Sequence, residues 1–484
     1  MSTESSNVAV KPQTMETPRV IPFYRYDRKQ KRFIAVLVQL PEVNKVDVLL
    51  GLQWGDEGKG KVVDALIKIL MKYDIVARFQ GGPNAGHTIE FDGRTFVFHN
   101  LPSGVTIPGV TNVIGDNVVI NPYELMCEIE KLLEAGYNLK DALKIAMLAN
   151  LITPMHRVLD MAMEKARGKG KIGTTGQGIG TCYADQTARK GLLVGYIGKT
   201  NYSYRKFRQK YNELKQEHLR VLASYGFKLD EFKLDGMTFN QYEKKWFKAI
   251  KYLRQFEFID CSNFINKALD EGKKVLAEGA QGSMLDVKHG SVPFVTSSNV
   301  LASGVCMGLG IAPNQVGRVF GLVKAYATRV GKGPFHTELH DRISELLRKN
   351  GHEFGATTGR PRRCGWLDLV AVKKMIQLSG VTDLVLTKSD VMDYFKSVKV
   401  AIAYKYKGKF ITDLPFEANT KKMTPVYKKF PGWGKGINEN GTISENLELY
   451  IRFIEKYLGV PITLVSYGPD REQIIIREPF AVAA

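Results

Sequence analysis

Cysteine is scarce in this sequence, and its spacing argues against a disulfide-stapled fold. The 484 residues include five cysteines, an odd number, scattered without a C-x-x-C pair. Such a distribution is typical of chains whose thiols stay reduced in a cytosol-like compartment. We therefore expect a cytoplasmic protein.

Long apolar runs are also missing. No stretch approaches the roughly 18 to 20 residues needed to span a bilayer, so we expect a soluble chain with no membrane partner. The basic cluster 28–32 before the apolar segment 33–40 faintly imitates a signal sequence, but it lies far from the terminus and lacks a small-residue cleavage site. We predict a disordered arm over residues 1–24 and an edge strand over 33–40. An organellar transit peptide is the alternative, and Glu4 and Glu16 count against it.

Acidic residues are outnumbered by basic ones. The chain has 69 Lys and Arg against 49 Asp and Glu, a formal net charge of +20. This surplus favours anionic partners, which include nucleic acid, a membrane surface, and phosphorylated or carboxylated substrates, and charge does not choose among them. Many lysines lie between Lys199 and Lys251 among Tyr and Phe, where a solvated helical face is favoured over a nucleic-acid patch.

The hydrophobic pattern predicts an α/β fold. A buried-type strand at 46–50 is followed by a glycine loop and by apolar residues at helical spacing over 62–73. We predict a large mixed, mostly parallel central sheet covered by helices, with residues 1–45 as an extension, 46–484 as the main domain, and a purely helical subdomain at about 199–269. Further strand signals lie at 112–114, 274–276, 316–322, 383–386, 398–403 and 461–465.

The loop from Gly51 to Lys61 has the composition of a phosphate site. It lies between a strand and a helix, where backbone N–H groups and the helix dipole favour anions, and it fits G-x-x-x-x-G-K. The next residue is Val62, so the hydroxyl that holds magnesium in a P-loop is missing. Asp56 is then the available hard oxygen ligand. A tight turn without a ligand is the alternative, which the two lysines and two acids in the loop disfavour.

A second glycine loop, 81–88, follows the strand-like segment 75–79 and contains His87 between small residues. A lone histidine is more often structural than catalytic. Beside a phosphate loop that carries an aspartate, however, an imidazole completes the set of groups needed to move a proton and a phosphoryl group.

Two further segments point to nucleotide and anion binding. The sequence Thr387-Lys388-Ser389-Asp390 ends a strand and is close to N-K-x-D, in which the carboxylate accepts both guanine N–H groups; a helix cap is the alternative. The segment 355–366 combines a Gly/Thr hinge with three arginines, which bind carboxylate or phosphate bidentately. A nucleic-acid patch is the competing interpretation, although no aromatic stacking platform accompanies it.

Together these motifs resemble the adenylosuccinate synthetase family over residues 46–482. The matching segments are 53–61, 84–88, 173–176, 278–282, 295–299, 328–331, 359–366 and 468–471. The resemblance implies a GTP-dependent ligase that joins L-aspartate to inosine monophosphate (IMP). It would give adenylosuccinate, GDP and phosphate through a 6-phosphoryl-IMP intermediate, the first committed step from IMP to AMP.

The same resemblance assigns catalytic roles. Asp56 would remove the N1 proton of IMP, and His87 would act as the acid toward the transferring phosphate. Lys59 would neutralise charge on the γ-oxygens, with Gln281 as a further catalytic residue. Asp56 and the carbonyl of Gly86 would hold Mg²⁺.

Binding sets are implied as well, together with a homodimer and no nucleic-acid partner. IMP would contact Asn84, Ala85, Gly86, His87, Thr175, Gln281, Thr296 and Arg360, and Arg189 of the partner subunit. Aspartate would contact Ala356, Thr357, Thr358, Gly359, Arg360 and Arg362. GTP would contact Gly55, Asp56, Glu57, Gly58, Lys59, Gly60, Lys61, Gly86, His87, Thr88, Arg362, Lys388, Ser389, Asp390, Ser466, Tyr467 and Gly468.

Some features depart from the family pattern, and two rival functions stay open to test. Gln177 stands where a basic residue is common, Thr181 replaces a proline, and Asn117 replaces a glycine, which Asn tolerates because it visits left-handed conformations. A regulatory GTP-binding switch is the first rival, but it would need the hydroxyl missing at Val62 and a D-x-x-G segment, which the sequence lacks. A basic nucleic-acid-binding protein is the second, and it would retain salt-dependent binding to random duplex at physiological ionic strength.

Overall fold

The computed structural model describes residues 20–27, 32–39, 44–71, 73–91, 93–355, 359–419, 421 and 423–477. The chain divides into two units, 1–44 and 45–484. In the first unit, strand β1 (Val20–Asp27) pairs antiparallel with β2 (Arg32–Gln39) in a two-stranded sheet. The prediction of disorder was therefore wrong for residues 20–24, and the predicted edge strand is one half of a hairpin. Two segments rich in β-branched and aromatic residues flank a short charged connection, a pattern that favours pairing with each other.

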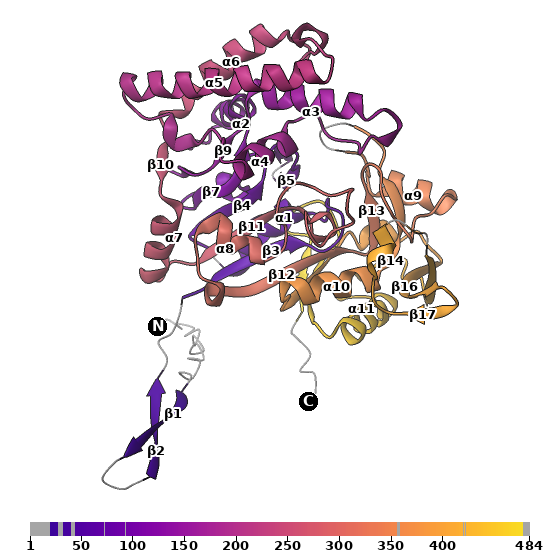
Figure 1. The fold of residues 1–484 in the computed structure, drawn as a ribbon. Helices are drawn as coiled ribbons and strands as arrows, with labels where there is room; N and C mark the ends of the chain where they lie inside the picture. Colours follow the sequence, from indigo (N-terminus) through magenta and orange to yellow (C-terminus); the bar gives the residue numbers. More distant parts are fainter. Residues whose placement is uncertain are drawn as a thin grey trace, which may run out of the picture. The chain divides into compact units, whose positions relative to one another are not determined.

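The second unit is built on a twisted, mostly parallel sheet, as predicted (Figure 1). Within the described residues it has eleven strands, and every pairing except β19–β20 is parallel. In spatial order the strands are β10 (Glu257–Ile259), β8 (Leu143–Ala146), β7 (Thr111–Ile120), β4 (Ile75–Gly81), β11 (Val275–Gly282), β3 (Val46–Gly51), β12 (Val316–Lys324), β15 (Asp383–Thr387), β19 (Ile462–Ser466) and β20 (Ile474–Ile476), with β9 (Asn150–Leu151) beside β7.

The central strands are buried on both faces because helices cover both sides. β4 is buried along its whole length, and β3 is buried except for Asp47. The covering helices include α2 (Pro122–Glu134), α8 (Ser303–Leu309), α10 (Leu369–Ser379) and α11 (Glu445–Leu458). The predicted helix over 62–73 begins three residues earlier, as α1 (Lys59–Ala65), and continues as a π-helix, Leu66–Met71.

A second, smaller sheet was not predicted. It contains β13 (Tyr326–Arg329), β14 (Arg363–Asp368), β16 (Ser397–Tyr406), β17 (Lys409–Ile411) and β18 (Thr424–Pro431), with helix α9 (Arg342–Asn350) against β14. The strand signal at 398–403 belongs to this sheet and not to the central one. Its antiparallel pairings with β17 and β18 are local in sequence, which periodicity alone does not distinguish from a strand of the large sheet.

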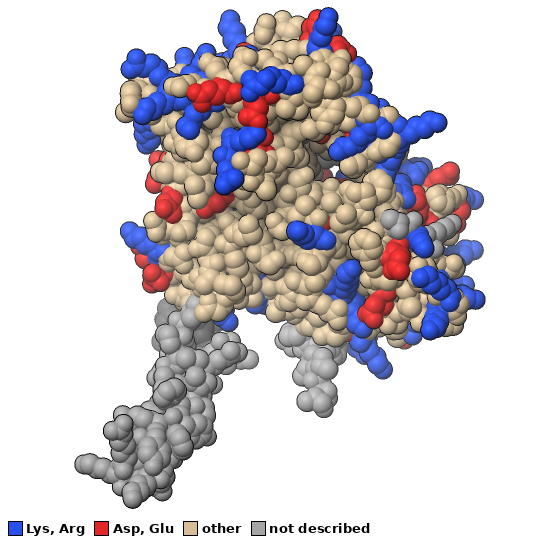
Figure 2. Space-filling view, in the orientation of Figure 1, with Lys and Arg blue, Asp and Glu red and all other residues tan. Residues whose placement is uncertain are grey.

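The predicted helical subdomain is only partly helical. Helices α5 (Asn201–Ser224) and α6 (Phe239–Leu253) pack around the fully buried Trp246, but β10 joins the central sheet before α7 (Cys261–Asp270) begins. Figure 2 shows lysines and arginines spread over α5 and α6 with acidic residues among them, as in a solvated helical face. Along the described residues, no helix has both the length and the apolar character to cross a membrane.

The remaining elements surround the sheet edge where loops collect. They are the hairpin β5 (His87–Phe91) and β6 (Arg94–Phe98), and the helices α3 (Pro154–Ala166) and α4 (Ile179–Thr187). The loops that follow β3, β4, β11 and β15 all leave the carboxyl ends of parallel strands. In open α/β sheets this edge is where ligands bind.

Candidate functional site

A cavity of about 860 Å³ lies at this edge, and most of the predicted site residues line it. The phosphate loop, the second glycine loop, the arginine segment and the end of β15 all contribute to its wall, although they are far apart in sequence. The predicted residues that line the cavity are Gly55, Asp56, Gly58, Lys59, Gly60, Lys61, Asn84, Ala85, Gly86, His87, Thr88, Thr175, Gln281, Thr296, Arg360, Arg362, Lys388, Asp390, Ser466 and Gly468.

The phosphate loop is held in shape by Glu57. This side chain is fully buried, and its carboxylate accepts hydrogen bonds from the backbone N–H groups of Gln53 (3.2 Å) and Gly55 (2.9 Å). A Cβ at Gly51 would lie 2.1 Å from a carboxylate oxygen of Glu57, so only glycine fits there. Glu57 therefore shapes the loop with its side chain turned away from the cavity, and only its backbone is left for a phosphate.

The two lysines of the loop have different partners. Lys59 forms a buried ion pair with Glu57 (Nζ–Oε2 2.7 Å). Lys61 donates to Ser466 Oγ (2.8 Å) and to the carbonyls of Gly468 (2.5 Å) and Gln473 (3.0 Å), which ties the loop to the segment after β19. Burial lowers the pKa of Lys61 to about 8, although nearby carboxylates oppose the shift.

Asp56 reaches the cavity in an unusual backbone conformation. Its φ is 61°, in the left-handed region that non-glycine residues rarely adopt, and its carboxylate is paired with Arg362 (Nε–Oδ2 2.9 Å). Gln281, Lys388 and Arg189 also have φ between 55° and 64°. Backbone strain of this kind gathers at functional sites, and these four residues were all predicted from the sequence to act on ligands.

His87 begins β5 and is fixed by a carboxylate that the sequence prediction missed. Its Nδ1 contacts Glu278 Oε1 on β11, and both side chains are buried. Ser103 also holds Glu278, through its N–H (2.8 Å) and its hydroxyl (2.5 Å). With Nδ1 facing Glu278, Nε2 is left without a protein partner among the described residues. Burial lowers the pKa of His87, and Glu278 opposes that shift.

The predicted IMP residues meet across three segments. Gln281 Nε2 donates to Asn84 Oδ1 (2.9 Å), and Asn84 Nδ2 approaches Thr296 Oγ1 (3.5 Å). The buried Gln281 Oε1 has no hydrogen-bond partner among the described residues. An amide and a hydroxyl held in this way present polar groups of fixed direction to a ligand.

The guanine element, the segment 387–390 that is predicted to bind guanine, is joined to the phosphate loop. Thr387 Oγ1 donates to the carbonyl of Glu57 (2.9 Å), so the residue that replaces the expected asparagine still links the two segments. Asp390 lines the cavity, and one of its oxygens is buried without a hydrogen-bond partner in the described structure. Burial raises the pKa of Asp390, against the influence of Lys388 and Lys61.

Several predicted residues are placed elsewhere. Ser389 Oγ donates to the carbonyl of Ser466 (3.2 Å), and neither Ser389 nor Tyr467 lines the cavity. Arg189 is exposed beyond the end of α4, away from this wall. Ala356, Thr357 and Thr358 lie outside the described residues, and Gly359 is described but is not part of the cavity wall.

The three departures from the family pattern leave the named groups in place. Thr181 Oγ1 donates to the carbonyl of His156 (2.9 Å), and Gln177 is buried. Asn117 lies within β7 and does not have a positive φ. Asn117 therefore does not need a left-handed backbone conformation, because it has the ordinary extended backbone of a strand.

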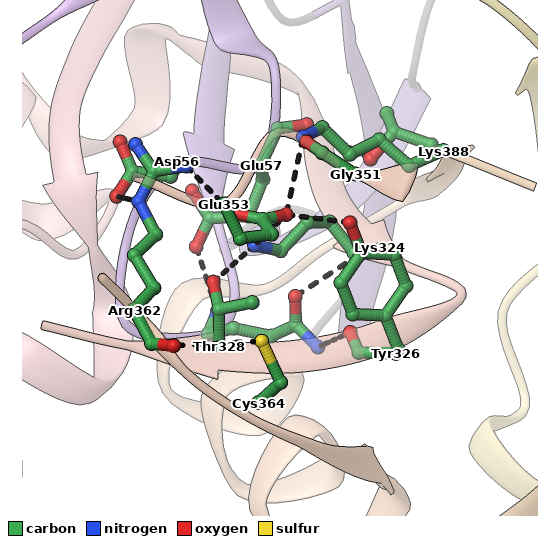
Figure 3. Close-up of polar contacts among 12 residues, drawn as sticks. Asp56, Glu57, Lys324, Tyr326, Thr328, Gly351, Glu353, Arg362, Cys364 and Lys388 are labelled. Carbon is green, nitrogen blue, oxygen red and sulfur yellow. Dashed lines mark hydrogen bonds and ion pairs between the residues drawn. The ribbon is translucent and has the colours of Figure 1, made fainter. Parts of the chain in front are cut away.

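Two buried glutamates that contact predicted site residues were not identified from the sequence. Glu278 orients His87, and Glu353 gathers Lys324, Arg362 and Lys388 at one carboxylate (Figure 3). The sequence does contain a signal for Glu278, because this residue is the first of the family-matching segment 278–282, which follows the predicted strand 274–276. Glu353 stands in a short irregular segment after α9 and had none.

Comparisons with known proteins point to one family. The family model described as adenylosuccinate synthetase matches residues 48–475. The adenylosuccinate synthetase of Porphyromonas gingivalis is 52% identical over 439 residues, covering 90% of this chain and 100% of the relative, and that of Bacteroides fragilis is 49% identical over 436 residues, covering 90% and 99%.

Solved structures give the same result. The structure of fully ligated adenylosuccinate synthetase from Plasmodium falciparum has a TM-score of 0.81 at 35% identity and covers 90% of this chain and 100% of that one. Succinoaminodeoxyadenylate synthetase from cyanophage S-2L, solved with dGMP and with dATP as an energy donor, has a TM-score of 0.57 at 19% identity, with 90% and 96% covered. At that identity the second likeness concerns the fold alone.

Proposed function

The chain belongs to the adenylosuccinate synthetase family and catalyses the GTP-dependent ligation of L-aspartate to IMP, and we propose that Asp56 and His87 carry out its chemistry in the cavity described above. The observation that carries this assignment is the convergence of both side chains on one cavity, next to a phosphate loop and a carboxylate that can accept guanine N–H groups. The reaction forms GDP and belongs to AMP biosynthesis.

The first step activates the purine. Asp56 accepts the N1 proton of IMP, and the negative charge moves to O6, which attacks the γ-phosphorus of GTP. The bond from that phosphorus to the β-γ bridging oxygen breaks, and GDP leaves with the electron pair. Lys59 lies in the same wall and offsets charge on the γ-oxygens. Asp56 is ion-paired with Arg362. This pair must open so that the carboxylate can contact IMP before it accepts the proton.

His87 serves as the acid during phosphoryl transfer. This role needs a proton on Nε2, the ring nitrogen without a protein partner in the described residues. Neutral imidazole is favoured by burial, but the carboxylate of Glu278 at Nδ1 stabilises the charged ring, and an arriving phosphate would favour it further. Glu278 is thus a positioning residue that also supplies compensating charge.

The second step forms the C–N bond. The amine of aspartate attacks C6 of the phosphorylated purine, and phosphate leaves with O6. The segment from Ala356 through Arg362 would bind the two carboxylates of aspartate. Arginines such as Arg360 and Arg362 bind carboxylates bidentately. Gln281 and Asn84, which are hydrogen-bonded to each other, would hold IMP.

The residues present fit Mg²⁺. Val62 is fully buried and carries no hydroxyl, whereas Asp56 and Gly86 line the cavity and offer a carboxylate and a carbonyl. These are the hard oxygen donors that Mg²⁺ prefers. When bound, the ion would neutralise the phosphate oxygens of GTP.

We also propose a cytoplasmic homodimer in which Arg189 completes the partner's IMP site. Arg189 is exposed, has a φ of 64° and lies outside the cavity wall of its own chain, which is compatible with a role across an interface. All five cysteines are free, as expected in a reducing compartment. Residues 46–484 would form the catalytic domain.

A four-component assay tests the proposed chemistry. Adenylosuccinate should form only when IMP, aspartate, GTP and Mg²⁺ are all present, and replacing GTP with ATP should abolish most turnover. Equal rates with ATP would contradict the role of Asp390. A GTP-binding switch would instead hydrolyse GTP in the absence of IMP and aspartate.

A further inference from the structure

Glu353 is fully buried at the junction of four segments, behind the cavity wall. Its neighbours Gly351, His352, Phe354 and Gly355 line the cavity, but Glu353 does not. Ligands therefore do not reach this carboxylate, and any part it has in the reaction must pass through the side chains that it holds.

Three cations and one hydroxyl converge on this carboxylate (Figure 3). Oε2 accepts from Arg362 Nη1 (2.5 Å), while Oε1 accepts from Tyr326 Oη (2.5 Å), Lys388 Nζ (3.1 Å) and Lys324 Nζ (3.3 Å). Burial alone would favour the neutral acid, but Lys324, Lys388 and Arg362 hold the pKa of Glu353 far below its usual range. The group is therefore an anion that organises cations.

Arg362 connects Glu353 to the proposed catalytic base. Its guanidinium donates to Glu353 through Nη1 and forms an ion pair with Asp56 (Nε–Oδ2 2.9 Å) without hydrogen-bond geometry, so it lies between the two carboxylates. The backbone also connects the two segments. The Arg362 N–H donates to the Glu353 carbonyl (2.9 Å), and Phe354 forms an isolated antiparallel β-bridge with Pro361. Glu353 and Arg362 thus close the base of the segment proposed to bind aspartate.

Lys388 connects the same carboxylate to the guanine element. Its ammonium is anchored by Glu353 and by the carbonyl of Gly351 (2.8 Å), and its φ is 55°. With the ammonium anchored, the methylene stem of Lys388 is left to lie over a purine whose N–H groups face Asp390. A lysine without this anchor would be free to turn its ammonium toward Asp390.

We propose that Glu353 is a positioning residue that sets Arg362 for aspartate and Lys388 for guanine at the same time, so that the two substrate sites depend on one buried carboxylate. This inference rests on the proposed roles of Arg362 and Lys388. It predicts that loss of the carboxylate changes the binding of two chemically unrelated substrates together.

The test measures KM for each substrate in Glu353→Gln. We expect KM for GTP and KM for aspartate each to rise at least tenfold, while KM for IMP changes less than threefold. A merely structural defect would lower the concentration of active enzyme, and hence the apparent kcat, without raising either KM. An unchanged KM for either GTP or aspartate would overturn the proposal.

A second variant guards against failure to fold. Glu353→Gln leaves the fully buried Lys324 without its anion, so the double variant Glu353→Gln with Lys324→Met removes both charges at similar volume. It should show the same paired rise in KM. Tyr326→Phe is the matched control, because it removes one donor to the same carboxylate and contacts neither Arg362 nor Lys388 through that hydroxyl. It should change each KM less than threefold.

Single variants at Arg362 and Lys388 test the proposed roles of these two residues separately from the inference about Glu353. Lys388→Met should raise KM for GTP, and Arg362→Gln should raise KM for aspartate together with KM for GTP, because Arg362 is also predicted to contact the nucleotide. If either has no effect, the assigned role of that residue is wrong, and the inference falls with it. If both behave as expected while the Glu353 variants leave one KM unchanged, the roles stand and only the inference about Glu353 fails.

Discussion

The buried glutamates Glu57 and Glu353 organise neighbouring parts of this site in different ways. Glu57 takes its polar partners from its own loop, at Gln53, Gly55 and Lys59, whereas Glu353 takes them from strands and loops that are up to 35 residues away, at Lys324 and Lys388. The first arrangement shapes a backbone cradle for phosphate. The second connects Arg362 and Lys388, which are proposed to contact different substrates. The difference shows that one site combines a motif built from a single loop with a junction of segments that are distant in sequence.

The largest effect on kcat is expected at Asp56 and His87, the two residues proposed to carry out the chemistry. Asp56→Ala and His87→Ala should each lower kcat by about 10²- to 10⁴-fold. His87→Ala should also lower the unfolding temperature, because it removes the partner of the buried Glu278. Steady-state rates with all four components, alongside thermal unfolding, provide the measurement. A near-normal kcat in either variant would remove that residue from the mechanism.

Glu278→Gln should be next in size. Glutamine keeps the shape but cannot compensate the charge of protonated His87, so we expect kcat to fall about 10²-fold with little change in KM. Ser103→Ala is the control, because it removes one hydroxyl donor to the same carboxylate and leaves the charge in place. A large rise in KM for IMP, with kcat preserved, would mean that Glu278 shapes the binding site and does not assist proton transfer.

Asp390→Asn tests the guanine element that Glu57 and Thr387 connect to the phosphate loop. Loss of charge-assisted hydrogen bonds of about 1.5–3 kcal/mol should raise KM for GTP by roughly 10- to 100-fold. Xanthosine triphosphate should rescue the variant, because an amide N–H can donate to the xanthine 2-oxygen. Equal use of GTP and xanthosine triphosphate by the wild-type enzyme would contradict this assignment.

The smallest effect is a pH dependence that arises from Lys61 in the phosphate loop. Burial lowers the pKa of Lys61 to about 8, so the folded free enzyme loses this charge as pH rises through that value, and the charge is fully present well below it. The ratio kcat/KM for GTP should therefore show a fall as pH rises through about 8, in addition to any fall at lower pH from His87, since this ratio reports groups of the free enzyme. Lys61→Arg should remove the fall, because arginine stays charged. An identical alkaline limb in that variant would assign the titration to another group.

The contrast between the glutamates also explains what the sequence could predict. The phosphate loop, the guanine element and the mostly parallel sheet are encoded in contiguous motifs and in strand periodicity, and the structure confirms the fold. The second sheet, the hairpin at 20–39 and the strand at 257–259 depend on pairing partners that periodicity does not identify. Glu353 was missed for the same reason, since its role exists only after Arg362 and Lys388 have been brought to it.

The central claim is that O6 of IMP becomes phosphorylated within the cavity that Asp56 and His87 line. IMP labelled with ¹⁸O at position 6 tests it directly by mass spectrometry of the released phosphate. The account predicts that each turnover transfers the label into phosphate, because O6 leaves with the phosphoryl group when aspartate attacks C6. Unlabelled phosphate, with the ¹⁸O released as water, would show that O6 was never phosphorylated and would contradict the account.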